Sequence, residues 1–264
     1  MSDILELRRK LINELLPFTG ANSDGVSNQV LLENYVEKVE EVALLKILGE
    51  ISDNPSMTVE DLYDNMGENY EVAFADRRHI EKSLKLIAEQ NSFEVAADLG
   101  CGTGMSTKPL LSIAKQVIAL DISSVMLDLA QKRLGDENVR YIQADFIKKI
   151  PLEDNSVDFI FSVGATRHIP NGSEESFFSE CARILSPGGK MLVTFVTPAE
   201  GEAGILDKAL QGYMNAHGIS DRRFHEDQVI KYCNDNGFII EDIQRETSKY
   251  LYGKLFVIAR RADS

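Results

Sequence analysis

The chain has 264 residues, 44% of them hydrophobic, and a formal net charge of −14, which is enough for one large core with an appended subdomain. No apolar run approaches the roughly 20 residues of a membrane-spanning helix and the first residues do not form a signal peptide, so no membrane partner is expected. The acidic excess repels nucleic-acid phosphates, so no nucleic-acid partner is expected, and three scattered cysteines predict free thiols in a reducing, cytoplasmic compartment.

The first 75 residues are acidic and carry helical patterns. They hold 15 acidic and five basic side chains, which is −10 of the total charge. Apolar residues share one helix face over 3–16 and again over 27–51, and a capping-box pattern begins a third helix at Thr58. The charge indicates a solvated acidic surface, with attraction of a cationic or amine-bearing substrate as the alternative. The helices could equally form a dimer interface or extend the core, so a homodimer stays open.

Residues 95–104, VAADLGCGTG, combine an apolar strand ending in Asp98 with glycines at every second position. Glycine lets the backbone approach a ligand and permits positive φ, so this turn can cradle a nucleoside. Dinucleotide sites usually need a further glycine at the next position, where this chain has Met105. Taken alone, the run also fits an ordinary tight turn between a strand and a helix.

The residues that follow predict a repeated alternation of strands and helices. A second strand ends in Asp121, 17 residues after Gly104, where an acid in a doubly wound sheet binds ribose hydroxyls. The alternation predicts a parallel sheet with right-handed crossovers, whose ligands bind beyond the carboxyl ends of the strands. Asp98, Asp145 and Ser162 fall at that edge with Asp121. The strands are predicted over 95–98, 115–121, 138–146, 156–162 and 189–196, and the helices between them include 123–134 and 174–185.

With these residues the chain resembles the class I S-adenosylmethionine-dependent methyltransferases, most closely the small-molecule group called type 11. The motifs DLGCGTG, ALDIS, QADF, VDFIFS and LSPGGKMLVTF carry the resemblance, which covers residues 93–260. It implies an α/β fold: a doubly wound, Rossmann-like, seven-stranded, mostly parallel sheet that ends in an antiparallel hairpin. The implied domains are an N-terminal helical cap, or substrate lid, over 1–75 and a cofactor-binding core over 76–264, with a substrate-side insertion near 197–224.

The same resemblance implies S-adenosylmethionine as cofactor and S-adenosylhomocysteine as product. The glycine loop would hold the methionine part, Asp121 both ribose hydroxyls, and Asp145 the adenine amino group. Family members often place an aromatic residue at the position of Tyr70, against the methionine end. The candidate cofactor-binding residues are Tyr70, Asp98, Gly100, Cys101, Gly102, Gly104, Asp121, Ile122, Met126, Asp145, Phe146 and Ser162.

Methyl transfer requires mainly that nucleophile, methyl and sulfur be aligned in a desolvated pocket. A base is needed chiefly for a hydroxyl or an activated carbon. His168, just past the fourth strand where the family often shows a histidine, is the candidate catalytic base, and a structural hydrogen bond is the alternative. The candidate substrate-binding residues are Arg167, which could bind an acidic group or form a surface ion pair, and Tyr213, His217 and Phe224 of the insertion, for which packing on the sheet is the alternative.

We therefore predict methyl transfer from S-adenosylmethionine to an O or N atom of a small metabolite or natural product. Residues 162–164 lack the acid with which catechol-type enzymes hold magnesium, so no metal is expected. Two alternatives stay open: an enzyme of this fold that uses the cofactor for cyclisation or transfer of another group, and a non-catalytic S-adenosylmethionine-binding protein. A nicotinamide dehydrogenase comes last because Met105 breaks its fingerprint.

Overall fold

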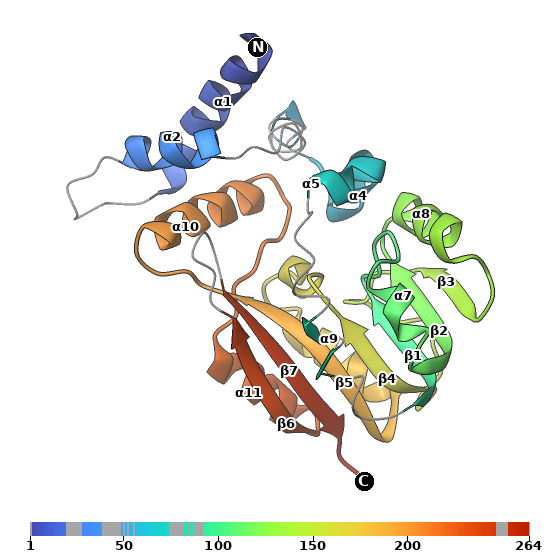
Figure 1. Cartoon of the computed structure of the whole chain (residues 1–264). Helices are drawn as coiled ribbons and strands as arrows, with labels where there is room; N and C mark the ends of the chain where they lie inside the picture. The colour runs from blue at the N-terminus through green and yellow to red at the C-terminus, as the bar shows by residue number, and fades with distance from the viewer. Residues whose placement is uncertain are drawn as a thin grey trace. The chain divides into compact units, whose positions relative to one another are not determined.

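The computed structural model describes residues 2–19, 28–38, 49, 51, 53–54, 56–73, 82–83, 85–86, 92–246 and 253–263. The chain divides into two compact units, which we describe separately (Figure 1). The first comprises Met1–Ala75, Pro198–Asp221 and Thr247–Gly253, and the second Asp76–Thr197, Arg222–Glu246 and Lys254–Ser264. No helix within the described ranges is both long and apolar enough to cross a membrane.

The second unit is built on a seven-stranded sheet with the strand order β3-β2-β1-β4-β5-β7-β6. The first five strands of the chain pair in parallel, and β6 pairs with β7 in antiparallel fashion. This sheet confirms the predicted doubly wound, Rossmann-like architecture with its C-terminal hairpin. The strands are β1 (Phe93–Leu99), β2 (Ala114–Asp121), β3 (Val139–Gln143), β4 (Val157–Ser162), β5 (Leu185–Thr197), β6 (Phe238–Glu246) and β7 (Gly253–Arg261).

The central strands form because both of their faces are covered. The last residues of β1, β2 and β4 are continuously buried, as expected for parallel strands with helices on both sides. An aromatic cluster joins helix to sheet: Phe178 stacks on Phe195 of β5 and on Tyr232, with ring centroids 5.8 and 5.4 Å apart. The helical segments of this unit are α7 (Thr107–Leu110), α8 (Ser124–Leu134), η3 (Thr166–His168), α9 (Glu174–Ile184) and α11 (Glu226–Asp235).

The boundaries of three predicted elements differ from the structure by three or more residues at one end. The predicted strand over 138–146 is too long, because β3 ends at Gln143 and Asp145 lies in a turn in which its own backbone carbonyl accepts from Lys148 N at 3.0 Å. Strand β5 begins at Leu185, earlier than the predicted start at 189. The helix of the insertion, α10 (Gly201–Ala216), also begins earlier than the predicted start at 205.

Among the described residues, the regular elements that lie wholly within the first unit are helices. Thr58 begins α4 with the predicted capping box: its hydroxyl accepts from Asp61 N at 3.1 Å, and the Asp61 carboxylate accepts from Thr58 N at 2.9 Å. The predicted helix over 27–51 is described as α2 over 28–38, and residues 39–48 lie outside the described residues. The other elements are α1 (Ser2–Leu15), η1 (Leu16–Phe18), α2 (Asn28–Lys38), α4 (Val59–Met66), η2 (Gly67–Asn69) and α5 (Tyr70–Ala73).

Candidate functional site

The glycine loop follows β1 at the carboxyl edge of the sheet. Gly100, Gly102 and Gly104 have φ angles of 80°, 52° and 79°, in the left-handed region that favours glycine. The backbone N–H groups of Gly100 and Cys101 both donate to Leu120 O, at 2.8 and 2.9 Å, which ties the loop to β2. The sequence therefore needs glycine here for the backbone path of the loop.

Packing around the loop excludes side chains at two of these glycines. A Cβ on Gly100 would lie 2.4 Å from the Cβ of Ala165, and one on Gly104 would lie 2.9 Å from Leu134 Cδ1 and 3.1 Å from Ala130 Cβ. The loop is thus held between α8 on one side and the residue before η3 on the other. Ala165 brings the segment that carries the candidate base into direct contact with the candidate cofactor loop.

Asp98 is fully buried near the end of β1. Its Oδ2 accepts from Ser106 Oγ at 2.9 Å and from Thr107 Oγ1 at 2.8 Å, whereas Oδ1 is buried with no hydrogen-bond partner among the described residues. Burial raises the pKa of Asp98 to about 7, and the charge of Asp121 adds to this, although both hydroxyls act in the opposite direction. Because an unpaired buried oxygen costs free energy, this position favours a ligand that donates a hydrogen bond, above all a cationic one.

Asp121, the last residue of β2, is nearly buried, with 7% of its surface exposed. Its Oδ2 accepts from Gly102 N at 2.8 Å and its Oδ1 from Ser123 N at 3.0 Å. A carboxylate only accepts hydrogen bonds, which is the chemistry by which such a group binds neighbouring hydroxyls. The following residue, Ile122, is half-buried, while Met126 is fully buried in α8.

Asp145 and Phe146 lie in the turn after β3. Asp145 Oδ1 accepts from Ile147 N at 3.2 Å, and its Oδ2 pairs with Lys148 Nζ at 3.2 Å. The half-buried Phe146 ring lies with Cε1 only 3.6 Å from the position that a Cβ on Gly100 would occupy. The structure therefore brings Phe146 to the glycine loop, together with Asp98 and Asp121.

Two of the predicted cofactor residues have framework roles in the structure. Ser162 is buried at the end of β4, where its hydroxyl donates to Leu99 O of β1 at 2.7 Å. Cys101 is also buried, and its thiol donates to Gly102 O at 3.6 Å. Burial raises the pKa of the Cys101 thiol, so the sulfur stays neutral and is a poor nucleophile.

The candidate base lies on η3, in the loop that follows β4. Thr194 of β5 anchors the start of this loop, because its hydroxyl accepts from Gly164 N at 3.0 Å and its carbonyl accepts from Thr166 Oγ1 at 2.6 Å. His168 is half-buried at the end of η3, and its backbone N–H donates to Ala165 O at 3.0 Å. One short helical turn thus separates His168 from Ala165, the residue that contacts Gly100.

The predicted substrate residues are divided between the two units. Arg167 is half-buried on η3. Phe224 is fully buried in the core of the second unit, with its ring centroid 5.1 Å from that of Phe195, so packing, and not an open pocket, occupies its side chain. In the first unit, Tyr213 is fully buried and its hydroxyl donates to Glu14 Oε2 at 3.1 Å.

Two further predicted residues belong to the first unit. The ring of His217 lies 4.4 Å from that of Tyr213, and its Nδ1 donates to Tyr213 O at 2.8 Å, which leaves Nε2 as the basic nitrogen of the neutral ring. Tyr70 is half-buried, with its ring 5.8 Å from that of Tyr63. The roles of these residues toward a ligand remain proposals.

The sequence patterns do not predict Ser106 and Thr107 as partners of Asp98. They follow the glycine run directly, and hydroxyls eight and nine residues after a buried acid are the signal by which they could have been found. Within the part of the chain that the structure describes, no group of three or more His, Cys, Asp or Glu residues is placed to hold a metal ion.

Comparison with known proteins gives a family match and several relatives. Residues 97–193 match the family model described as a methyltransferase domain. The chain is 33% identical over 160 residues to malonyl-[acyl-carrier protein] O-methyltransferase of Yersinia pestis, covering 60% of this chain and 57% of that protein. It is also 33% identical over 200 residues to phosphoethanolamine N-methyltransferase 2 of Caenorhabditis elegans, covering 71% and 44%. The chain thus spans about half the length of the curated relatives that it matches.

Solved structures with this fold are similar over most of the chain. A chain in the complex between the Haloferax volcanii Trm112 methyltransferase activator and a putative methyltransferase matches with a TM-score of 0.63 and 17% identity, covering 76% of this chain and 97% of that one. The Burkholderia thailandensis 1,6-didemethyltoxoflavin-N1-methyltransferase, solved with 1,6-didemethyltoxoflavin and S-adenosylhomocysteine, matches with a TM-score of 0.58 and 18% identity, covering 75% and 85%. At these identities the likeness establishes the fold alone. Together with the family match, it shows that residues 97–193 resemble a methyltransferase domain within a fold shared with solved methyltransferase structures.

Proposed function

We propose that this protein transfers a methyl group from S-adenosylmethionine to an O or N atom of a small metabolite or natural product, without a metal ion. The observation that carries the proposal is the buried, unpartnered Oδ1 of Asp98 beside a glycine loop to which Asp121 and Phe146 also converge. The cofactor has an ammonium group, a ribose and an adenine. These are the groups that a buried carboxylate, a second carboxylate and an aromatic ring would hold.

The residues divide the work of binding and catalysis as follows. Asp98 and the glycine loop would hold the methionine end, Asp121 the ribose, and Ile122, Asp145 and Phe146 the adenine, with Cys101, Met126 and Ser162 supporting the loop and its neighbouring elements. When bound, the cofactor supplies an electrophilic methyl group on a sulfonium sulfur. The protein then has to align the acceptor and exclude water, and His168 would remove the acceptor's proton where the acceptor is a hydroxyl.

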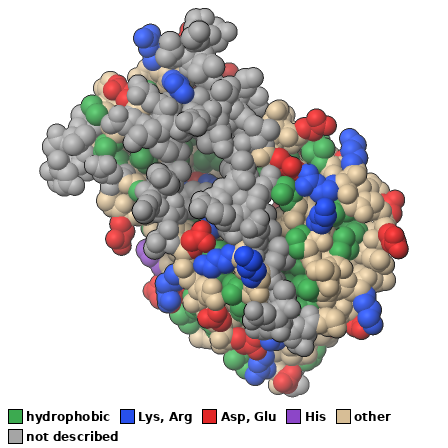
Figure 2. Space-filling model, viewed as in Figure 1, with side chains coloured by type: hydrophobic (Ala, Val, Ile, Leu, Met, Phe, Trp, Pro, Cys, Tyr) green, Lys and Arg blue, Asp and Glu red, His purple; other side chains and the backbone are tan. Residues whose placement is uncertain are grey.

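The first unit would serve as the substrate lid. It groups Met1–Ala75 with Pro198–Asp221, so the predicted cap and most of the predicted insertion belong to one compact body. Tyr70, Tyr213 and His217 would act from this body. Charge argues for a small acceptor over a nucleic acid: acidic and basic side chains of the described residues are interspersed over the face drawn in Figure 2, whereas phosphate backbones are bound by basic stripes.

The names of two relatives support an O or N acceptor, whereas that of a third gives a carbon acceptor, so experiment has to identify the acceptor. One relative is an O-methyltransferase of malonyl-[acyl-carrier protein] and another an N-methyltransferase of phosphoethanolamine. A third, the sterol 24-C-methyltransferase ERG6B of Gibberella zeae, is 29% identical over 135 residues. Acceptors are therefore to be screened by mass spectrometry for the gain of one methyl group.

Calorimetric titration with S-adenosylhomocysteine, with NADH as control ligand, tests the cofactor class. We expect a dissociation constant of about 1 μM, near −8 kcal/mol, and no signal from NADH. Absence of binding by both S-adenosylhomocysteine and S-adenosylmethionine would contradict the proposal.

Asp121→Ala should weaken S-adenosylhomocysteine binding by about 1–3 kcal/mol, roughly 5- to 150-fold, because it removes charge-assisted hydrogen bonds to the ribose. Asp158→Ala is the matched control. The Asp158 carboxylate also accepts from two backbone N–H groups, those of Glu94 and Val95 at 3.2 and 3.0 Å, but it lies at the amino end of β4, away from the glycine loop. Equal affinities for Asp121→Ala and Asp158→Ala would show that the ribose assignment is wrong.

The affinity for S-adenosylhomocysteine should rise with pH up to about 7 and then level off. In the free protein the raised pKa keeps Asp98 protonated below about pH 7, whereas an ammonium group binds the carboxylate, so binding releases a proton. Titrations between about pH 5.5 and 8.5 should show an almost tenfold loss of affinity for each unit below the pKa. The Asp98→Asn variant should bind weakly and without this dependence. A flat profile for the wild-type protein would count against the ammonium contact.

A further inference from the structure

Arg222 is the residue at which the chain returns from the insertion to the second unit. Its backbone N–H donates to Arg167 O of η3 at 2.7 Å. Two residues on, the backbone N–H of Phe224 donates to Val196 O of β5, also at 2.7 Å. The segment 222–224 is therefore hydrogen-bonded both to η3, which carries the candidate base, and to the end of β5, after which the insertion begins.

The side chain of Arg222 holds the far end of the same loop. Separate guanidinium nitrogens donate to Asn171 Oδ1 and to Glu174 Oε1. The other oxygen of Glu174 accepts from Gly172 N at 2.7 Å. The Arg222 and Glu174 side chains are only 19% and 5% exposed, and the guanidinium lies 5.5 Å from the centroid of the Phe224 ring. The planar guanidinium group can donate to Asn171 Oδ1 and Glu174 Oε1 at the same time, in a fixed geometry that a lysine ammonium does not impose.

These contacts fix the loop between β4 and α9 from both sides of His168. Thr194 binds Gly164 and Thr166 before it, and Arg222 binds Arg167 O, Asn171 and Glu174 around and after it. Ala165, which packs on Gly100 of the cofactor loop, lies between the two residues that Thr194 binds. The backbone segment that carries His168 is therefore anchored on both sides.

We propose that Arg222 is a positioning residue, which fixes the backbone of η3 and thereby holds His168 in register with the glycine loop. The role of His168 as base rests on the proposed function, but the placement of η3 by Arg222 does not. A substitution at Arg222 keeps its backbone hydrogen bond to Arg167 O but removes the side-chain contacts to Asn171 and Glu174. The loss of these side-chain contacts should displace the base by a small distance and lower turnover, because methyl transfer depends on alignment.

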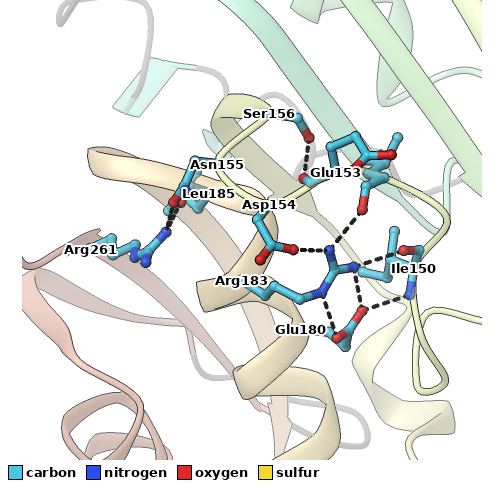
Figure 3. A network of polar contacts seen from close by, with 10 residues as sticks. Ile150, Glu153, Asp154, Asn155, Ser156, Glu180, Arg183, Leu185 and Arg261 are labelled. Carbon is cyan, nitrogen blue, oxygen red and sulfur yellow. Dashed lines mark hydrogen bonds and ion pairs between the residues drawn. The ribbon is translucent and has the colours of Figure 1, made fainter.

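Helix α9 supplies a matched control at its other end. Arg183 binds Glu180 and Asp154 with a similarly dense set of hydrogen bonds, but at the amino edge of the sheet, before β4 and β5 begin (Figure 3). Weakening Arg183 should therefore lower the stability of the same helix without moving η3. A variant there separates a loss of stability from a loss of positioning.

The test uses the imidazole signals of the four histidines in the full-length protein labelled at histidine. The His168→Gln variant identifies the His168 signal in a two-dimensional NMR spectrum. We expect Arg222→Gln to shift and broaden that signal, Arg222→Lys to shift it less, and Arg183→Lys to leave it unchanged while lowering Tm. S-adenosylhomocysteine affinity should stay within about threefold of wild type in Arg222→Gln, since the glycine loop keeps its own anchors.

Two results would overturn the proposal: a His168 signal in Arg222→Gln that superimposes on wild type, or an equal displacement in Arg183→Lys. If Arg222→Gln does not fold, the shift in Arg222→Lys decides the matter by the same criterion. If the wild-type protein does not bind S-adenosylhomocysteine, the proposed function fails while the NMR comparison still decides the role of Arg222. Once an acceptor is found, Arg222→Gln should lower kcat by about tenfold or more and leave KM within about threefold.

Discussion

Replacing Gly100 by alanine is expected to abolish measurable S-adenosylhomocysteine binding and to lower the free energy of unfolding by about 3 kcal/mol. The added Cβ would lie 2.4 Å from the Cβ of Ala165, and the φ of 80° is itself unfavourable for alanine. Both carbons are attached directly to the backbone, so no rotamer change relieves the clash. The loop or η3 has to move instead, and either movement disturbs the proposed cofactor site.

Gly135→Ala is the control for the backbone conformation alone. Gly135 has a φ of 71° and a ψ of −169°, a conformation almost confined to glycine, but a Cβ there would meet nothing within 4 Å, so the substitution should cost about 1–3 kcal/mol through the backbone alone. Urea unfolding measures both variants and calorimetry their binding. The double variant Gly100→Ala/Ala165→Gly should recover part of the loss, because it removes one of the two clashing atoms. Identical behaviour of Gly100→Ala and Gly135→Ala would refute the contact between the glycine loop and η3.

Arg183→Met is expected to lower the free energy of unfolding by about 2–3 kcal/mol. Figure 3 shows the guanidinium between α9 and the segment before β4, where it donates to Ile150 O and Leu152 O at 2.8 and 2.7 Å. It also pairs with Glu180 at 2.7 Å, and the two side chains are only 20% and 16% exposed. Methionine fills similar space but leaves two carbonyls and a largely buried carboxylate without this partner.

The pair also has a defined pH dependence. Arg183 holds the pKa of Glu180 below its ordinary value of 4.5, so the pair stabilises the fold above that value and the contribution is lost as the pH falls through the lowered pKa. Arg245→Met is the control, because the Arg245 side chain is 61% exposed beside Glu226 and its loss should cost no more than about 1 kcal/mol. Urea unfolding at neutral pH compares the two. A similar cost for both would mean that the network of Figure 3 contributes little.

The sheet could be predicted from the sequence because its signals are local. Strands covered on both faces read as apolar runs, and an acid near the end of β1 and another at the end of β2 interrupt those runs at the carboxyl edge. Asp98 and Asp121 were identified in this way. Asp145 was placed at a strand end, yet it lies in a turn, because a short side chain that accepts from Ile147 N competes with the strand ladder.

What could not be predicted depends on contacts between distant residues. Phe224 reads as an aromatic residue of a loop, and only the tertiary structure shows that it is packed on Phe195. Arg222 and Glu174 are 48 residues apart, and no periodicity or motif connects them. The clash that requires glycine at position 100 involves Ala165, in a different crossover of the sheet. Sequence patterns give the direction in which a side chain points, but not what it meets there.

The two ends of the insertion are hydrogen-bonded to each other, which bears on how this segment could be exchanged. Strand β5 ends at Thr197, and the backbone N–H of Phe224 donates to Val196 O. The intervening stretch of about 25 residues therefore begins and ends at the same place. Segments whose ends meet on a stable framework are the ones that proteins exchange or enlarge without refolding the rest. A different segment spliced between Thr197 and Arg222 would leave both anchoring hydrogen bonds intact, which makes this junction a natural place for grafting a new segment onto an unchanged sheet.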